Sequence, residues 1–294
     1  MLLDELRTLL ARHARPDWTT EIDGVLICRV EEPTPPSVSM TGTVMALIAQ
    51  GAKHLALGER VYEYRAGQYL VTSVDLPVTG QFTEASRERP ALGFGLMLQS
   101  SAIAETLLQA APGAVQRSVT VPPGMVVSDA PDELLDAVVR LLRLLDHPPD
   151  IDVLAPLVKR EILWRLITGD QGATIRQFGL ADSNLSHIAR AVRWIRENYA
   201  KSFRVEDLAQ LIGMSTSAFY RHFQAVTAMS PIQFQKQIRL QEARLLLATH
   251  PKDVAGACYS VGYDSPSQFS REYRRLFGTS PSEDATRLHT SGAF

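Results

Sequence analysis

Two segments in the last third of the chain repeat one pattern at an offset of fifty residues. The first, SAFYRHFQAVTAMSP, begins at Ser217, and the second, SQFSREYRRLFGTSP, begins at Ser267. The corresponding positions are Phe219 and Phe269, Arg221 and Arg271, Phe223 and Tyr273, Ser230 and Ser280, and Pro231 and Pro281. Two copies of one supersecondary unit are the simplest explanation.

Each copy has the layout of a helix, a tight turn and a second helix. In the first copy we expect a helix over residues 205–211, a turn at Gly213 and a second helix that begins after Ser215. Glycine adopts the positive φ of such a turn without strain, and a serine side chain accepts hydrogen bonds from the free N–H groups of the helix after it. The pattern predicts two helix-turn-helix units, and in that motif the second helix enters the major groove of DNA.

Helical geometry divides each second helix into a buried and an outward face, at about 100° per residue. The buried faces are Phe219, Phe223 and Val226 in the first copy and Phe269, Tyr273 and Leu276 in the second. Arginine can pair with guanine or phosphate, and serine and glutamine can read adenine or position the backbone. The predicted DNA contacts are Ser215, Ser217, Tyr220, Arg221, Gln224, Ser267, Gln268, Arg271 and Arg274. The alternative is that the arginines are ordinary solvated surface side chains.

A single helix over residues 231–248 is expected to connect the two units. Its apolar residues extend most of the way round, as expected for a helix packed between two subdomains. At ~1.5 Å per residue it spans roughly 25 Å. With the flanking helices added, the two second helices would lie about one DNA turn apart, ~34 Å, so that one chain reads two successive major grooves.

The charge distribution favours the same part of the chain for a polyanionic partner. The net charge is −2, but residues 184–294 hold 14 Lys and Arg against 9 Asp and Glu, which leaves 16 against 23 for the rest. Cys28 and Cys258 fit no metal or redox spacing, which indicates a reducing compartment. The uncharged run over 33–52 opens with three prolines, so it does not predict a membrane helix. We expect a cytoplasmic protein without a membrane partner.

The first third of the chain has the pattern of a small antiparallel β-barrel. Short runs rich in strand-forming residues follow one another between glycines and prolines. The predicted strands lie within residues 24–30, 43–51, 53–58, 60–67, 68–78 and 91–98. A short helix over 2–14 precedes them, and helices over 101–111, 131–146 and 154–168 follow.

The predicted helix over 131–146 carries a continuous apolar stripe, formed by Leu134, Val138, Leu141, Leu142 and Leu145. Either the barrel of the same chain or the same helix of a second subunit could cover this stripe, so a homodimer is one expectation. Residues 169–183 are rich in glycine and polar side chains and are predicted to be a linker. The predicted domains are therefore 1–168 and 184–294, and beyond the linker helices are expected over 185–200, 205–211, 216–225, 231–248, 251–259 and 266–276.

The segments LAQLIGMSTSAFYRHF, RLQEARLLL and VGYDSPSQFSREYRRLFGTSP resemble the DNA-binding domain of the AraC/XylS family of bacterial transcription regulators. LIAQGAKHLALGERVYEYRAGQYLVTSVDLPV resembles the cupin-like N-terminal domain of one branch of that family. The resemblance implies an α+β multidomain chain: a cupin-like β-barrel with flanking helices, then an all-α domain of two helix-turn-helix units. It also implies that the outward positions contact promoter DNA and that the protein acts on RNA polymerase.

The barrel offers few residues for chemistry. His54 is the only histidine between His13 and His147, so the three or four ligands of a cupin metal site are missing. We find no catalytic motif and expect neither an enzyme nor a cofactor. A metal-free barrel is still a concave apolar container for a small-molecule effector. Candidate lining residues are Met45, His54, Tyr62, Tyr64 and Tyr69, each of which could equally be ordinary core or surface.

These features predict a sequence-specific DNA-binding transcription regulator controlled by a small molecule in the barrel. Activation and repression are equally compatible with the residues. One alternative is a constitutive DNA-binding protein whose barrel is only structural or dimerising. Another is an enzyme built on the barrel with a DNA-binding accessory domain, and the missing metal ligands and nucleophile argue against it.

Overall fold

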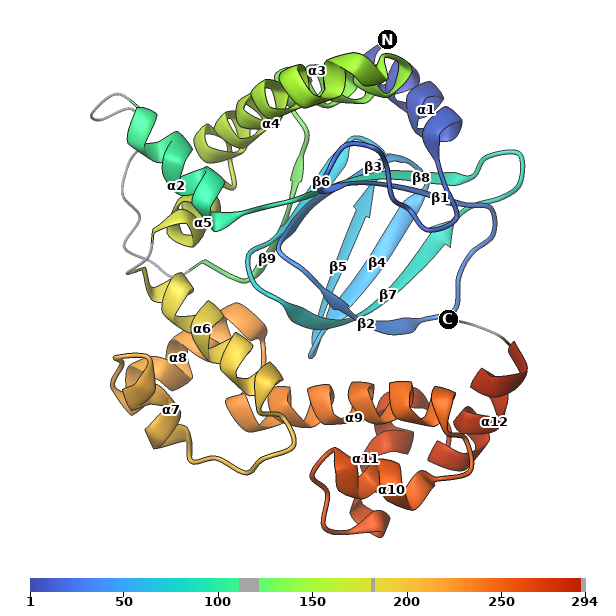
Figure 1. Ribbon diagram of the computed structural model, residues 1–294, viewed down its shortest axis with the longest axis vertical. Coiled ribbons are helices and arrows are strands. Elements are labelled where there is room, and N and C mark those ends of the chain that lie inside the picture. The colour runs from blue at the N-terminus through green and yellow to red at the C-terminus, as the bar shows by residue number, and fades with distance from the viewer. Residues whose placement is uncertain (111–121, 181–182, 292–294) are drawn as a thin grey trace. The chain divides into compact units, whose positions relative to one another are not determined.

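The computed structural model describes residues 1–110, 122–180 and 183–291, and it divides into two units. The first consists of Met1–Ala189 with Ala225–Ala228, and the second of Arg190–Gln224 with Met229–Phe294. Two antiparallel sheets with flanking helices form the first unit, and the second unit is helical (Figure 1). This is the predicted fold class. No helix within the described ranges has both the length and the apolar character needed to cross a membrane.

The strands of the first unit lie in two sheets in which every neighbouring pair is antiparallel. The first sheet has the order β1 (Val25–Val30), β8 (Ala91–Met97), β3 (Val44–Gln50), β6 (Gln68–Thr72) and β9 (Met125–Asp129). The second has the order β2 (Ser37–Thr41), β7 (Leu76–Glu84), β4 (Ala52–Leu57) and β5 (Arg60–Arg65). The chain crosses repeatedly from one sheet to the other, which lets the sheets enclose a common interior.

The structure differs from the predicted strands at three places. The run over 68–78 is not one strand, because the chain leaves the first sheet after Thr72 and enters the second at Leu76. Strands β2 and β9 were not predicted. β2 is a half-exposed edge strand of sequence SVSMT, too polar to give a strand signal, and β9 lies outside the compact series of apolar runs.

Helices of the first unit cover one face of the first sheet (Figure 1). They are α1 (Leu2–His13), α2 (Ser100–Gln109), α3 (Asp132–Arg143), α4 (Ile151–Thr168) and α5 (Gly172–Gly179). Two short 3-10 turns, Leu144–Asp146 and Pro148–Asp150, connect α3 to α4. The apolar stripe of α3 is fully buried in one cluster with Leu6, Leu10 and Phe94. Its partner is therefore the same chain, through α1, α4 and the first sheet.

Helix α5 lies inside the segment that was predicted to be a linker, residues 169–183. Thr174, Ile175 and Gln177 are buried, and Ile175 belongs to the core of the first unit. Gly179 closely approaches Ile103 of α2: a Cβ built at residue 179 would lie 2.5 Å from an Ile103 methyl carbon. Although residues 169–183 are polar in composition, they include a helix that packs into the core. Most of this segment is therefore part of the first unit. The boundaries of the functional domains remain a prediction.

The helices beyond residue 183 follow the predicted order, with one addition. They are α6 (Asn184–Glu197), α7 (Val205–Leu211), α8 (Thr216–Thr227), α9 (Pro231–Thr249), α10 (Val254–Ser260), α11 (Pro266–Phe277) and α12 (Pro281–Ser291). The repeated Ser-Pro pair has a structural explanation, since it begins a helix each time. Ser230 accepts a hydrogen bond from Gln233 N at 3.2 Å, and Ser280 accepts one from Glu283 N at 3.3 Å. Serine caps α9 and α12, and the proline ring suits the first helical position.

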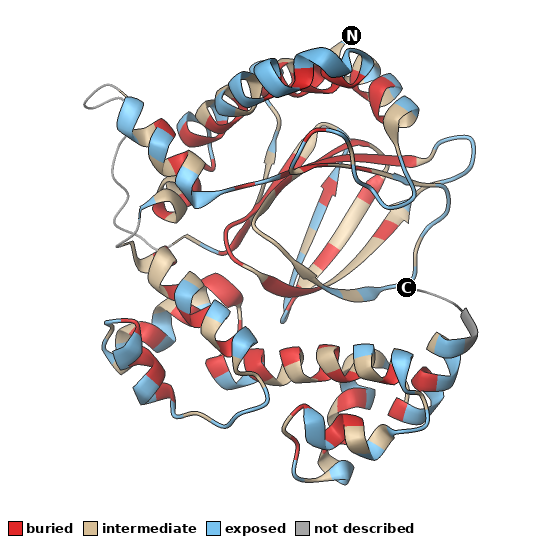
Figure 2. Ribbon diagram, in the orientation of Figure 1, coloured by how far each residue is buried: buried red, intermediate tan, exposed pale blue. Residues whose placement is uncertain are grey.

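Helix α9 contributes buried residues along its whole length (Figure 2). Near its start, the rings of Phe223 and Phe234 meet edge to face, with centroids 5.5 Å apart. In its second half, Leu240, Ala243 and Leu247 join the cluster built on α10 and α11. A single helix therefore supports both helix-turn-helix units.

The two turn glycines, Gly213 and Gly262, both have positive φ, +78° and +84°. Their surroundings differ. Nothing lies within 4 Å of a Cβ built at Gly213, whereas a Cβ at Gly262 would lie 2.1 Å from the carbonyl oxygen of Ala200. The second turn is therefore held against the backbone that follows α6, while the first turn is open.

Substitution of each glycine by alanine distinguishes two costs: the strain of a positive φ, and the steric clash of the new Cβ with Ala200. We expect Gly213→Ala to destabilise the protein by about 1–2 kcal/mol through the left-handed conformation alone. Gly262→Ala should cost about 1–3 kcal/mol more, because the backbone of Ala200 must move. Urea denaturation of both variants, followed by circular dichroism, measures the difference. Equal destabilisation would show that the contact with Ala200 is not tight.

The rotation of α8 can be tested in the same way. Phe219 is completely buried and lies 5.3 Å from the ring of Phe223, so Phe219→Ala should cost about 3–5 kcal/mol through the cavity it creates. Its neighbour Tyr220 is 41% exposed and serves as the control. Tyr220→Ala should change the free energy of unfolding by about 0.5 kcal/mol or less. Thermal unfolding at matched concentrations gives both values, and similar losses in the two variants would contradict the rotation.

Candidate DNA-binding helices and a cavity between the sheets

Helix α8 presents the predicted outward residues to solvent. Ser217, Tyr220, Arg221 and Gln224 are all exposed, and Phe219, Phe223 and Val226 are all buried. Ser215, just before the helix, is exposed, and its hydroxyl accepts a hydrogen bond from Ala218 N at 3.4 Å. The predicted rotation of the helix is therefore confirmed.

Helix α11 has the same division. Ser267, Arg271 and Arg274 are exposed, while Phe269 and Tyr273 are completely buried. Two residues depart from the expectation. Leu276 is only partly buried, and the side-chain amide of Gln268 is half-buried and donates a hydrogen bond to Glu272 at 3.0 Å.

The outward arginines differ from the arginines that hold the fold together. Among the described residues, no carboxylate forms an ion pair with Arg221, Arg271 or Arg274. By contrast, Arg244 donates to the buried carboxylate of Asp284 at 2.8 Å. The three outward guanidiniums are thus available for an external anion.

His222 lies next to Arg221, with 3.4 Å between its Nε2 and an Arg221 nitrogen. Burial and the charge of Arg221 lower the pKa of His222 below its ordinary value. The imidazole is therefore neutral near pH 7, and Arg221 is the cation of this pair.

A carboxylate fixes α11 to α9. Glu272 accepts hydrogen bonds from Lys236 of α9 at 2.8 Å, from Tyr263 at 2.7 Å and from Gln268 at 3.0 Å. Although burial alone would raise its pKa, these hydrogen bonds hold the pKa of Glu272 below its usual value. The outward face of α11 therefore has a fixed orientation relative to α9.

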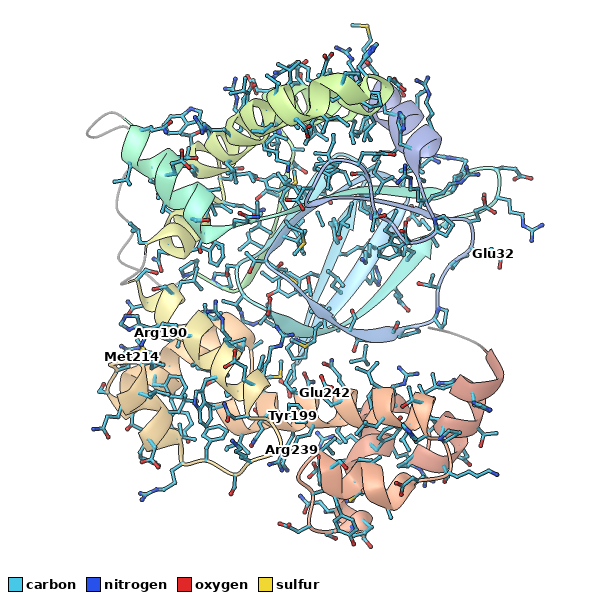
Figure 3. All side chains as sticks on the ribbon, in the orientation of Figure 1. Glu32, Arg190, Tyr199, Met214, Arg239 and Glu242 are labelled. Carbon is cyan, nitrogen blue, oxygen red and sulfur yellow. The ribbon has the colours of Figure 1, made fainter. Side chains whose placement is uncertain are left out.

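Arg239 connects α9 to backbone on both sides of it. Its Nε donates to the carbonyl of Tyr199 at 2.7 Å, and a terminal nitrogen donates to the carbonyl of Gly262 at 2.7 Å. Figure 3 shows Arg239 beside Tyr199. Gln235, one turn earlier, also donates to the carbonyl of Tyr199, at 2.9 Å. The segment after α6 and the turn before α11 are therefore attached to the same stretch of α9.

A cavity of about 480 Å³ lies between the two sheets of the first unit. Most of its lining is apolar. The pairing of the strands determines which side chains enter the cavity. Lys53 on β4 pairs with Tyr64 on β5 and with Phe82 on β7, so these three residues form one row across the second sheet. Cys28 on β1 faces this row from the first sheet.

Only one of the five predicted effector contacts lines the cavity, and that residue is Tyr64. Met45 and Tyr69 point from the first sheet into the core beneath the helices. His54 follows the inward Lys53 and therefore points outward, where its Nε2 lies 2.9 Å from Glu63. Tyr62 is partly exposed and is not among the lining residues.

The prediction missed Lys53, Cys28 and Phe82 as lining residues. A signal was present in the sequence, because Lys53 shares its strand face with Leu55 and Leu57. A lysine at an apolar position of an alternating strand marks a charge directed inward. Within the described ranges, no group of three or more His, Cys, Asp and Glu side chains is placed to hold a metal ion.

Comparison with known proteins identifies the family. Residues 21–174 match the family described as AraC-type transcriptional regulator N-terminus, and residues 208–287 match a helix-turn-helix domain family. The chain is 27% identical to the HTH-type transcriptional regulator ExsA of Pseudomonas aeruginosa, over 78% of this chain and 77% of that protein.

Solved structures show the same fold over nearly the whole chain. An apo structure of a ToxT variant from Vibrio cholerae matches with a TM-score of 0.55 and 10% identity, covering 90% of this chain and 98% of ToxT. ToxT bound to (E)-4-(8-methylnaphthalen-1-yl)but-3-enoic acid matches with a TM-score of 0.54 and 12% identity, covering 90% and 98%. With two outward helices on a shared support and both family matches in their expected order, the chain belongs to the AraC family of helix-turn-helix transcription regulators.

Proposed function

We propose that residues 184–294 bind promoter DNA through α8 and α11, which enter two successive major grooves. The proposed contacts are Ser215, Ser217, Tyr220, Arg221, Gln224, Ser267, Gln268, Arg271 and Arg274. The observation that carries this assignment is the pair Arg221 and Arg271: they occupy equivalent positions, and both are exposed without an ion pair in the described part of the chain. Such guanidiniums suit guanine O6 and N7 or phosphate.

Helix α9 supports the spacing required by this mode of binding. It has 19 residues, or about 28 Å at ~1.5 Å per residue. Helix α8 packs at its beginning, and α11 packs against its second half and is also joined to Lys236 in its first half. With the widths of the flanking helices added, this length is compatible with the ~34 Å between successive major grooves on one face of B-DNA.

We further propose that a small molecule in the cavity of the first unit controls DNA binding. The support is a built cavity of about 480 Å³, within the ~300–1,000 Å³ that small-molecule sites usually occupy. One ToxT structure with this fold holds an organic acid, and that observation belongs to ToxT. Effector binding changes DNA affinity only if the effector prefers one conformation of the protein to another. A constitutive regulator with a purely structural barrel is the alternative.

Association of two chains is also part of the proposal. The apolar stripe of α3 is used within the chain, but α4 leaves Val153, Leu154 and Leu157 exposed, at 68%, 40% and 57%. Residues 153 and 157 share one face of the helix. These side chains are the support for a homodimer. By family membership we propose that the protein acts on RNA polymerase at promoters in the bacterial cytoplasm and has no catalytic activity.

Alanine substitution of the two equivalent arginines tests DNA recognition. Bound fragments are first selected from the source genome with the full chain, and the strongest site is then used in footprinting and titration. Arg221→Ala and Arg271→Ala should each weaken binding by about 1–3 kcal/mol and relax preference at one base pair, in different half-sites.

Lys252→Ala is the matched control, because Lys252 is an exposed cation between α9 and α10. It removes one positive charge from the same unit without changing α8 or α11, so its footprint should stay that of the wild type. An unchanged footprint and affinity in both arginine variants would refute the assignment.

A further inference from the structure

Among the residues that the structure describes, one charged side chain lines the cavity between the sheets, that of Lys53. The other lining residues include no aspartate, glutamate, arginine or histidine. Lys53 Nζ lies 4.8 Å from the centre of the Phe82 ring, and no protein hydrogen bond or ion pair is formed by this ammonium among the described residues. The lysine is thus a cation without a counter-ion in a largely apolar chamber.

The strand register makes this placement a fixed property of the fold. Lys53 lies between Tyr64 on one side and Phe82 on the other, and the neighbouring inward position on β4 is Leu55. Two sets of pairing partners hold β4, so its register cannot slip without moving both neighbouring strands. The ammonium therefore cannot turn to the outer face, where His54 pairs with Glu63.

No anionic group faces Lys53 in the part of the chain that the structure describes. The thiol of Cys28 is the other ionisable group that faces it, together with the phenol of Tyr64. Burial raises the pKa of the Cys28 thiol and the pKa of the Tyr64 phenol, so both groups are neutral near pH 7. Burial also lowers the pKa of Lys53, because a charge is unfavourable in this environment. The attraction of an anion beside Nζ would offset that penalty.

We propose that the cavity binds an amphipathic carboxylate, with the carboxylate at Lys53 and an apolar chain or ring against the two sheets. This inference rests on the proposed function, which places an effector in the first unit, and it names the chemical class of that effector. The Tyr64 hydroxyl has no hydrogen-bond partner among the described residues and lies on the strand next to Lys53, where it can donate to the same carboxylate.

Charge and polarity exclude other classes of ligand. An organic cation would meet Lys53 without any carboxylate to neutralise it. A phosphate ester carries up to two negative charges and usually requires several donors or arginines, whereas one lysine is present. A sugar would need hydrogen-bonding partners around its whole surface. The serine, threonine and glutamine side chains of the lining, Thr34, Ser37, Ser39, Thr41 and Gln81, all come from β2, β7 and the segment before β2, whereas the wall formed by the first sheet, with Leu26, Val44 and Ile48, is apolar.

The experiment uses the full chain and three probes of one chain length: decanoate, decanol and decyltrimethylammonium. Isothermal titration calorimetry is performed below the concentration at which each probe forms micelles. Decanoate should bind the wild type, and Lys53→Met should weaken that binding at least about tenfold, as expected for loss of a charged hydrogen bond. Lys53→Arg should retain most of the affinity. Decanol should bind the wild type and Lys53→Met equally, and the cationic probe should bind the wild type least.

Lys252→Met is the matched control, since it removes an exposed lysine from the other unit and should leave decanoate binding unchanged. Thermal unfolding of each variant verifies that it is folded. Failure of decanoate to bind the wild type would overturn the proposal, and so would equal binding of decanoate by the wild type and Lys53→Met.

DNA titration in the same samples separates this proposal from the proposed function. If decanoate binds through Lys53 but the affinity for DNA does not change, the result supports the proposed ligand class and counts against effector control. A change in DNA affinity caused by ligands that bind equally to the wild type and Lys53→Met supports effector control and overturns the ligand class.

Discussion

Arg239 lies in the middle of α9 and donates hydrogen bonds to four backbone carbonyls, those of Tyr199, Ala200, Lys201 and Gly262. Three of these carbonyls come after α6, beside the first helix-turn-helix unit, and the fourth belongs to the turn of the second. Carbonyls near helix ends need donors that the helix cannot supply. One planar guanidinium satisfies several of them together, and it remains charged at any physiological pH. Together with the close approach of Gly262 to Ala200, this one side chain attaches the segment after α6 and the turn before α11 to the same part of α9.

The two helix-turn-helix units have the same arrangement of helices but are stabilised by different interactions. The first is packed mainly through aromatic rings, with Phe219, Phe223 and Phe234 in successive edge contacts. The second adds hydrogen-bonded carboxylates: the partly buried Glu272 accepts from three donors, and the buried Asp284 accepts from Tyr273 at 2.8 Å as well as from Arg244. Removing one member of such a network leaves a buried polar group without its partner, which is more costly than losing a surface ion pair. Substitutions in the core of the second helix-turn-helix unit should therefore be more destabilising than those in the first.

The rotation of α8 and α11 could be predicted from the sequence because two independent patterns agree. The 3.6-residue spacing of apolar side chains and the fifty-residue repeat both place Phe219 and Phe269 on the buried face. Helix α5 was missed, since its packing uses Gly172 and Gly179, which ordinarily indicate a loop. The break between β6 and β7 was also missed. The pattern of apolar residues along the chain does not show that the chain passes from one sheet to the other.

The candidate cavity was less accessible to sequence reasoning for a related reason. Tyr64 was predicted and lines it, but Met45 and Tyr69 belong to strands whose odd-numbered residues face the helices. Choosing residues by chemical type ignored this alternation. Lys53 could have been found by asking which charged residue shares a strand face with leucines. Its pairing with Tyr64 and Phe82, however, depends on contacts between strands distant in sequence.

The single helix between the two helix-turn-helix units limits the insertions and deletions that this architecture can accept. Each residue inserted into α9 advances the second unit by ~1.5 Å but also turns it by about 100°. In the proposed mode of binding, one residue added after Arg239 would aim α11 away from the duplex and withdraw Gly262 from Arg239, even though the change in length is small. Additions of about one turn (three or four residues) or two turns (seven residues) return the second helix-turn-helix unit to nearly its former direction, displaced by about 5.4 Å for each turn. In the proposed mode of binding, the distance between the half-sites is thus restricted to steps of a helical turn of α9, and recognition can change through the outward side chains instead.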